Sequence, residues 1–183
     1  FSASYEAAYA AYQRDLFELG KIEIAKALNV LPWNHDAIDL NERLDNLPHV
    51  LNLIGQAKVA QIENNPEKEA GLLSRTLAIT PERTALQTRM NELVQQIREK
   101  KFQKATNDAQ TLVAKNQIKK ARAAYNRARK IDPNRPELEI LTTEIKKRQS
   151  QVNLRKNRAE GDRFAKKDDW ESAKKVYEQA LQQ

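Results

Sequence analysis

The sequence predicts an all-α protein: an elongated array of helical hairpins joined by long connecting helices. Its 183 residues include only four glycines, and the stretches between prolines are rich in Ala, Glu, Lys, Leu, Gln and Arg, which favour helix. No run alternates apolar and polar residues with the β-branched side chains typical of a strand. A pattern of small and aromatic residues also recurs along the chain, and this recurrence predicts the length of one unit.

The composition excludes several classes of site. The chain has no cysteine, which rules out a disulfide framework, a thiolate metal site and a cysteine nucleophile. No run approaches the roughly 18 apolar residues of a membrane-spanning helix, so we expect no span. The chain begins at Phe1 and ends at Gln183, at the end of a predicted helix and without a closing proline, and we therefore expect it to be part of a longer protein.

Charge is distributed unevenly along the chain. Residues 1–97 carry 9 Lys and Arg against 13 Asp and Glu, whereas residues 98–183 carry 23 against 12. The second half is therefore strongly basic and suited to an acidic partner. The alternative is a solvated helical surface, together with end-to-end packing in the intact protein.

The clearest hairpin lies near the C-terminus, at residues 161–181. Gly161 leaves room for a second helix to approach, and Phe164 follows on the same face. The polar turn at residues 167–169 offers Asp168 or Asp169 as the N-cap of the next helix. In that helix small and aromatic residues recur at helical spacing, namely Ala173, Tyr177 and Ala180.

This order of small and aromatic residues resembles a tetratricopeptide (TPR) repeat. The resemblance implies stacked helical hairpins without catalytic chemistry, in which a protein or peptide ligand lies along the concave face built by the first helix of each unit.

Positions equivalent to the small and aromatic residues of this hairpin can be found upstream by counting back from prolines. Counted from Pro133, these positions are occupied by Ala128, Tyr125 and Ala121. Counting back from Pro81 gives a weaker match, because Glu69 stands at a position where the pattern has a small residue. Ala70 would occupy that position only after a shift of one residue.

The count from Pro32 completes a series of four units, which begin near residues 1, 50, 102 and 154. We interpret residues 1–183 as one repeat domain of this kind. The spacings of 49, 52 and 52 exceed the ~34 residues of an ordinary TPR unit. The extra residues lie between each proline and the next unit.

An insert of 18 residues equals five helical turns, which returns the apolar stripe to the same face. We therefore predict two continuous helices, at residues 82–115 and 136–167, each roughly 50 Å long. Each should pack its first half on the preceding short helix and its second half on the following one. Residues 146–151 have no apolar side chain and should form a solvated bridge. In the second unit Pro48 predicts a break or sharp kink.

The short helices are expected at residues 21–31, 67–79, 117–131 and 170–182. Pro66 fits the first turn of the second of these, and Asn116 fits the end of the long helix before the third. On the first helix Tyr5, Tyr9 and Tyr12 share one face, which we interpret as packing.

No constellation for catalysis or cofactor binding stands out. The two histidines, His35 and His49, belong to no zinc-binding pattern, and no phosphate-binding glycine loop or nucleophile motif occurs. We therefore expect no enzyme activity, cofactor, metal or small-molecule substrate.

The TPR resemblance does suggest a partner-binding face. Its positions carry over to six residues of the third and fourth units: Asn107, Gln110, Arg155, Arg158, Asp162 and Lys166. Asn107 and Arg155 match two places of the clamp that grips a peptide C-terminus in some TPR modules. Thr106 and Gln110 depart from its lysine and asparagine. Arg155 and Arg158 could also hold an acidic peptide by charge-assisted hydrogen bonds.

A second basic cluster offers nucleic acid as a partner. Lysines and arginines crowd residues 115–130, a density that suits phosphate contacts. The absence of a reading motif and of interleaved aromatic residues disfavours this interpretation.

The sequence thus favours a non-catalytic scaffold that binds a protein or an acidic peptide. A structural spacer or self-associating segment, with homo-oligomers as one outcome, is the main alternative. A resemblance to helical segments that flank other domains in bacterial envelope proteins points to the periplasm or cell envelope.

Overall fold

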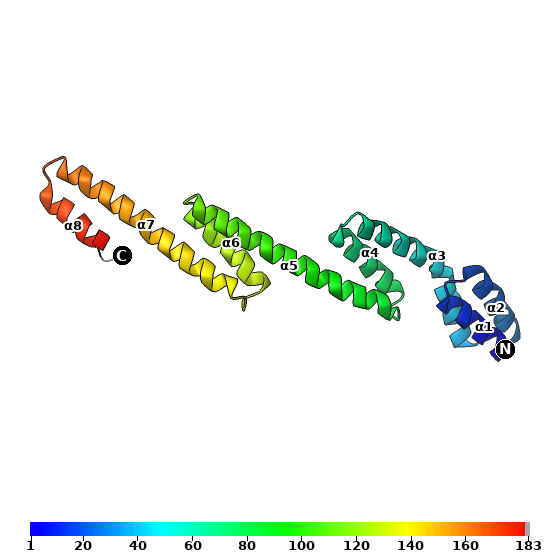
Figure 1. Ribbon diagram of the computed structural model, residues 1–183. Helices are drawn as coiled ribbons and strands as arrows, with labels where there is room; N and C mark the ends of the chain where they lie inside the picture. The colour runs from blue at the N-terminus through cyan, green and yellow to red at the C-terminus, as the bar shows by residue number, and fades with distance from the viewer. Residues whose placement is uncertain (182–183) are drawn as a thin grey trace. The chain divides into compact units, whose positions relative to one another are not determined.

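The computed structural model describes residues 1–181, and these form eight α-helices and no strand (Figure 1). The predicted all-α class is confirmed. The helices are α1 (Ser2–Gln13), α2 (Phe17–Val30), α3 (His35–Ile62), α4 (Pro66–Ile79), α5 (Thr84–Ala114), α6 (Ile118–Ile131), α7 (Glu137–Ala165) and α8 (Trp170–Leu181). The predicted last helix extended to Gln182, which lies outside the described residues.

The chain divides into two compact units, Phe1–Ile97 and Arg98–Gln183, and the boundary falls inside α5. It coincides with the change from the acidic to the basic part of the sequence. In the described part of the chain, none of the helices is both long and apolar enough to span a membrane.

Each of the four hairpin turns contains one residue with a positive φ angle. These residues are Asp15 (61°), Asn64 (53°), Asn116 (58°) and Asp168 (57°). Their spacings of 49, 52 and 52 residues equal those predicted for the repeat. Asn and Asp tolerate this left-handed conformation better than other side chains because they can hydrogen-bond locally. Asn116 was predicted to end its helix, and this is confirmed.

The same hydrogen bond closes each turn. The backbone N–H of the residue after the left-handed one donates to a carbonyl five residues earlier, as Asn65 does to Ala60 at 2.9 Å. This bond is part of the Schellman arrangement that ends many helices. The other three pairs are Leu16 with Ala11, Gln117 with Leu112, and Asp169 with Phe164.

The helix that follows a turn is capped by a side chain in several units. Asp169 accepts a hydrogen bond from the Ser172 N–H at 3.1 Å and is therefore the N-cap of α8, while Asp168 takes the left-handed position. Asn65 caps α4 in the same way, with Pro66 in the first turn as predicted. Asn34 caps α3 through the Ala37 N–H at 2.9 Å.

The long helices α3, α5 and α7 each pack against two successive short helices. One part of α5, around Leu93, packs on α4, and a later part, around Ala109, packs on α6. Likewise α7 contacts α6 through Leu141 and α8 through Gly161. Two predictions are thus confirmed: α5 and α7 are continuous helices, and each packs on both the preceding and the following short helix.

Gly161 does allow a close approach of helices. A Cβ atom at this position would lie 2.5 Å from Cε1 of Tyr177. Gly20 in α2 plays the same part, since a Cβ there would lie 2.4 Å from Cδ2 of Leu44 in α3. Both helix pairs therefore depend on the absence of a side chain.

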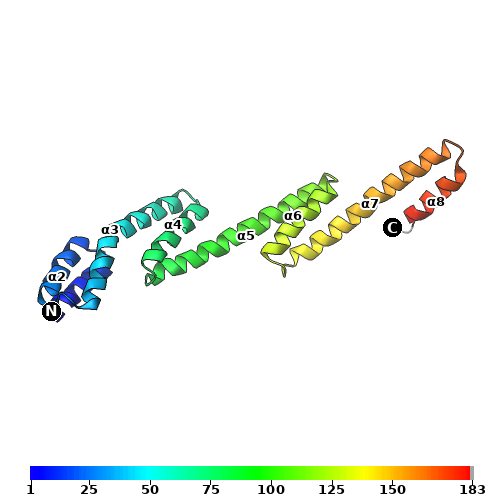
Figure 2. The ribbon, with the colours of Figure 1, turned by 180° about the vertical axis from the view of Figure 1, so that it is seen from behind.

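A break or a sharp kink was predicted at Pro48; the break is wrong, because α3 runs through the proline from His35 to Ile62. The ribbon of α3 does change direction along its length (Figure 2), in keeping with a helix that lacks one N–H donor. Leu47 and Val50, on either side of the proline, are fully buried. This packing holds both halves of the helix and offsets the local cost of the proline.

Two further expectations need correction. The helix α2 begins at Phe17, four residues before the predicted start. Residues 146–151 are not a fully solvated bridge either, because Arg148 is half-buried and donates to Gln151 at 2.9 Å. The tyrosine face of α1 is divided between two environments, with Tyr12 in the core and Tyr9 43% exposed.

Candidate functional site: a basic groove between α6 and α7

The exposed face of α6 is composed almost entirely of basic residues. Its fourteen residues include no Asp or Glu. The buried face consists of Ile118, Ala121, Ala124 and Ala128, and these small residues bring α6 close to its neighbours. The exposed cations are Lys119, Lys120, Arg122, Arg127, Arg129 and Lys130.

A groove runs between α6 and the first half of α7. It consists of two adjoining hollows, of about 750 and 350 Å³, which share Tyr125 and Thr142. Besides Arg135, three cations line it, namely Arg122, Arg129 and Lys146, and the one acidic side chain in its wall is Glu139. We call this feature the α6–α7 groove; its remaining lining residues are Asn126, Pro133, Asn134, Arg135, Pro136, Leu138, Thr143 and Ile145.

The three cations of the groove are available to a ligand. Within residues 1–181, no hydrogen bond or ion pair engages the side chains of Arg122, Arg129 or Lys146. By contrast, Arg127 on the same helix lies 3.8 Å from Asp108. The groove therefore presents positive charge that the described residues do not neutralise.

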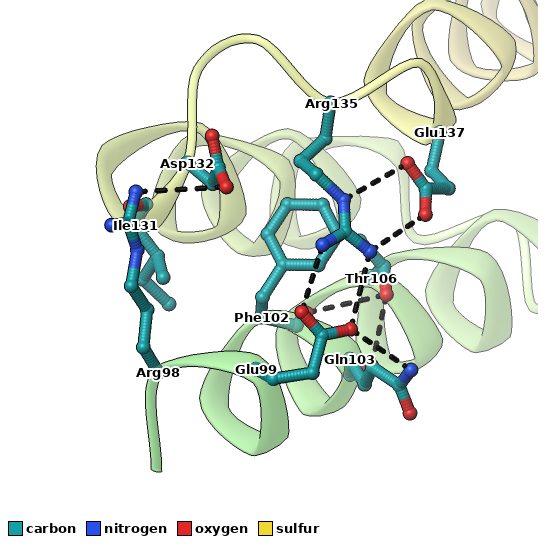
Figure 3. A network of polar contacts seen from close by, with 9 residues as sticks. All are labelled: Arg98, Glu99, Phe102, Gln103, Thr106, Ile131, Asp132, Arg135 and Glu137. Atoms are coloured by element: carbon teal, nitrogen blue, oxygen red, sulfur yellow. Dashed lines mark hydrogen bonds and ion pairs between the residues drawn. The ribbon is translucent and has the colours of Figure 1, made fainter. Parts of the chain in front are cut away.

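Arg135, at one end of the groove, is fully engaged by its own chain (Figure 3). Its guanidinium binds Glu99 of α5 with two hydrogen bonds of 2.8 and 3.1 Å, and Glu137 of α7 with two of 2.8 and 3.2 Å. It also lies over the ring of Phe102, 4.6 Å from the centroid. Arg135 is thus a structural residue of the α6–α7 turn, and ligand binding falls to the other three cations.

This network also shifts the pKa values of its members. The hydrogen bonds to Glu137 and then to Glu99 raise the pKa of Arg135, and both carboxyl groups have pKa values lowered mainly by Arg135. Arg98 strengthens the same end of α6 by donating from Nε to the carbonyl of Ile131 at 3.2 Å. Figure 3 shows both arginines holding the α6–α7 turn against α5.

Polar and apolar groups in the wall complement the charges. The Thr142 and Thr143 hydroxyls donate to the carbonyls of Leu138 and Glu139, which leaves their oxygens free to accept. The half-buried Tyr125 ring and the side chain of Ile145 add apolar surface. The groove can thus bind carboxylates by charge-assisted hydrogen bonds and an apolar side chain by burial.

The residues carried over from the TPR resemblance lie elsewhere. Asn107 and Gln110 are exposed on α5, and Arg155 and Arg158 are exposed on the second half of α7. In the described part of the chain, no hydrogen bond or ion pair joins the two sets.

The remaining two of these residues have structural contacts. Asp162 accepts a hydrogen bond from the Tyr177 hydroxyl at 2.6 Å, and Lys166 is the C-cap of α7. Thr106, at another clamp position, donates to the α5 carbonyls of Phe102 and Gln103. The clamp therefore stays a prediction.

Sequence reasoning did not predict the α6–α7 groove. The available signal was the crowding of Lys and Arg at residues 115–130, which we interpreted only as a phosphate-binding feature. Thr142 and Lys146 come from the next helix, and only the packing of α7 on α6 brings them beside Tyr125.

No protein-family model, curated protein or solved structure matches the chain. Its function must therefore be inferred from its own residues.

Proposed function

We propose that this chain is a non-catalytic scaffold of TPR-like helical repeats that binds an acidic protein segment in the α6–α7 groove. The observation that carries the proposal is the row of unpaired cations, Arg122, Arg129 and Lys146, beside a half-buried tyrosine. The recurring hairpins support the repeat class. An elongated shape stays a prediction that small-angle scattering would test.

The spacing of the cations defines the ligand further. Arg122 and Arg129 are separated by two helical turns, which is about 10 Å along α6. A segment in the polyproline II conformation, with three residues per turn, places side chains three residues apart on one face at about 9 Å. We therefore expect a ligand with acidic residues three positions apart and an apolar residue between them that contacts Tyr125.

The direct test is the binding of a fluorescently labelled peptide of glutamates and leucines, followed by anisotropy at low and moderate salt. Replacing Arg122→Glu and Arg129→Glu together should weaken binding by roughly tenfold or more, because each lost charge-assisted hydrogen bond contributes about 1.5–3 kcal/mol. A peptide with glutamines in place of the glutamates should bind poorly. Rising salt should weaken the interaction further.

Arg155→Glu with Arg158→Glu is the matched control, since it removes two exposed arginines outside the groove. It should leave peptide binding unchanged. If this variant loses binding and the groove variant keeps it, the binding face carried over from TPR modules is correct and the groove is not. A duplex DNA that binds more tightly than the peptide would favour nucleic acid instead.

A second candidate function is a structural spacer. The continuous helices α5 and α7, of 31 and 29 residues, favour it because they connect successive hairpins without a flexible linker. Failure of both the acidic peptide and DNA to bind at low salt would support the spacer over the scaffold.

A further inference from the structure

The turn between α4 and α5 contacts the end of α1 and the turn that follows it. Arg83 donates from Nη2 to Oδ1 of Asp15 at 2.6 Å, and the Tyr12 hydroxyl donates to the carboxylate of Glu82. The partners are 68 and 70 residues apart in the chain, and all four lie in the first compact unit, Phe1–Ile97. We call these two pairs the N-terminal clasp. In both ribbon views the start of α5 faces the group formed by α1, α2 and the first part of α3 (Figures 1 and 2).

The helix α3 connects the two sides of the clasp, and its packing is divided at Pro48. Buried α3 residues up to Leu47 belong to a cluster with α1 and α2, whereas those from Leu53 onward belong to a second cluster with α4 and α5. Pro48 lies in the short stretch between the two clusters. Because proline has no N–H and its ring crowds the preceding turn, a helix bends more easily there. The two clusters are thus joined through the position of α3 that bends most easily.

The next unit shows that the clasp is not required by the hairpin fold. Arg135 stands 52 residues after Arg83 and binds Glu99 and Glu137, which belong to the helices on either side of it. The preceding turn offers it Asn64, an uncharged residue, at the place of Asp15. The long helix of that unit, α5, contains no proline. The clasp and the bendable helix therefore occur together in the first unit, and the following unit has neither.

The clasp is built from contacts that are weak enough to open. The side chains of Arg83 and Asp15 are 20% and 39% exposed, and an ion pair within reach of water is screened by salt. In the described structure the Nε atom of Arg83 is buried without a hydrogen-bond partner, which disfavours the closed state. Opening would return this donor to water while both apolar clusters stay packed.

We propose that α3 is a hinge at Pro48 and that the N-terminal clasp is a salt-sensitive lock that holds this hinge closed. In the closed state the two turns are in contact. In the open state α3 straightens and the first hairpin swings away from the second. The α6–α7 groove takes no part in this motion, so the lock and the groove can be tested separately.

Spin labels measure the opening, since the chain has no cysteine of its own. Gln13→Cys and Ala85→Cys place labels at exposed positions on the two sides of the clasp. At low salt the labelled chain should give one short distance. Asp15→Asn with Glu82→Gln should add a population of longer distances, because the substitutions remove both negative charges. Asparagine at position 15 keeps the left-handed turn, as Asn64 and Asn116 show. Glu63→Gln, which removes an exposed ion pair elsewhere in the unit, is the control that should leave the distance unchanged.

Salt makes the same test without any substitution in the clasp. At about 1 M salt, where the Debye length is about 3 Å, the longer distances should also appear in the chain with the intact clasp. A single short distance in the clasp variant and at high salt would overturn the lock.

Pro48→Ala, added to the clasp variant, tests the position of the hinge. It should narrow the spread of distances, because α3 then regains its missing hydrogen bond and resists bending. An unchanged spread would overturn a hinge at Pro48. Circular dichroism should show the same helix content in all variants, and each should still bind the acidic peptide, so failure here differs from failure of the groove.

Discussion

Arg89 of α5 binds the carboxylate of Glu69 of α4 through two parallel hydrogen bonds, from Nε at 2.8 Å and from Nη2 at 3.0 Å. Glu69 is only 4% exposed. At the place of Glu69 the other hairpins carry Gly20, Ala121 and Ala173. At the place of Arg89 two of them carry the buried Leu40 and Leu141. The second hairpin thus has an ion pair where others have an apolar contact. Glu69 itself occupies the small-residue position of the pattern, so no shift of one residue to Ala70 is needed.

A double-mutant cycle should show that this ion pair is costly to break and inexpensive to replace. Arg89→Leu should lower the free energy of unfolding by about 3–5 kcal/mol, because it leaves a buried carboxylate without its partner. Glu69→Ala should cost less, about 1–2 kcal/mol, because Arg89 is partly exposed and can turn to water. The double variant should lie within about 1 kcal/mol of the wild type. Urea titrations followed by circular dichroism measure all three, and additive losses would contradict the expectation.

Substitution of glycine by alanine should have opposite effects at two positions. Gly161→Ala should destabilise the α7–α8 hairpin by about 1–3 kcal/mol, because the new methyl group collides with the Tyr177 ring. Gly55→Ala should stabilise the protein by about 0.5–1 kcal/mol, because no atom lies within 4 Å of the new Cβ and alanine favours helix. Thermal denaturation of the two variants makes the comparison, and equal shifts of the same sign would contradict it.

Tyr12 should make the protein less stable at high pH. Its hydroxyl donates to the carboxylate of Glu82, and burial together with this bond raises the pKa of Tyr12 to about 12 from the ordinary 10.0. A raised pKa in the folded state means that the stabilisation is complete below pH 10 and is lost as the pH rises through 12. The free energy of unfolding of the wild type should therefore fall more steeply over this range than that of Tyr12→Phe. Tyr9→Phe, at an exposed tyrosine, should follow the wild-type curve.

Replacing arginine by lysine should matter at Arg135 and not at Arg127. Arg135→Lys loses the paired hydrogen bonds to Glu99 and Glu137 and the stacking on Phe102, which a lysine cannot reproduce. Its midpoint of thermal unfolding should drop. Arg127→Lys changes only an exposed pair 3.8 Å apart and should leave the midpoint almost unchanged. Equal midpoints for the two variants would mean that the network around Arg135 adds no stability.

Local signals in the sequence predicted most of the helices and two of their ends. The roles of Asn116 and Asp169 depend on their neighbours in the chain, and the role of Gly161 depends on its small size. Each of the three residues has the role that the sequence predicted. Pro48 is different, because its local preference is opposed by the burial of Leu47 and Val50, and that burial depends on tertiary packing. Arg148 is likewise half-buried although its sequence neighbours are polar.

The candidate site was less predictable than the fold. Tyr125 and Thr142 belong to different helices, and their juxtaposition depends on how closely the small residues of α6 let α7 approach. Charge density alone indicated a positive surface and did not distinguish a phosphate backbone from a carboxylate. The pairing of Arg135 with two glutamates removes one cation from that surface, which composition could not show.

The four hairpin turns are closed by hydrogen bonds between residues at most five positions apart. Such a turn needs no distant part of the chain, and its loop-closure entropy is small. Contacts of short sequence separation are those that form fastest in folding. We therefore expect each hairpin to assemble as its own segment leaves the ribosome, so that the chain folds in order from the N-terminus while synthesis continues.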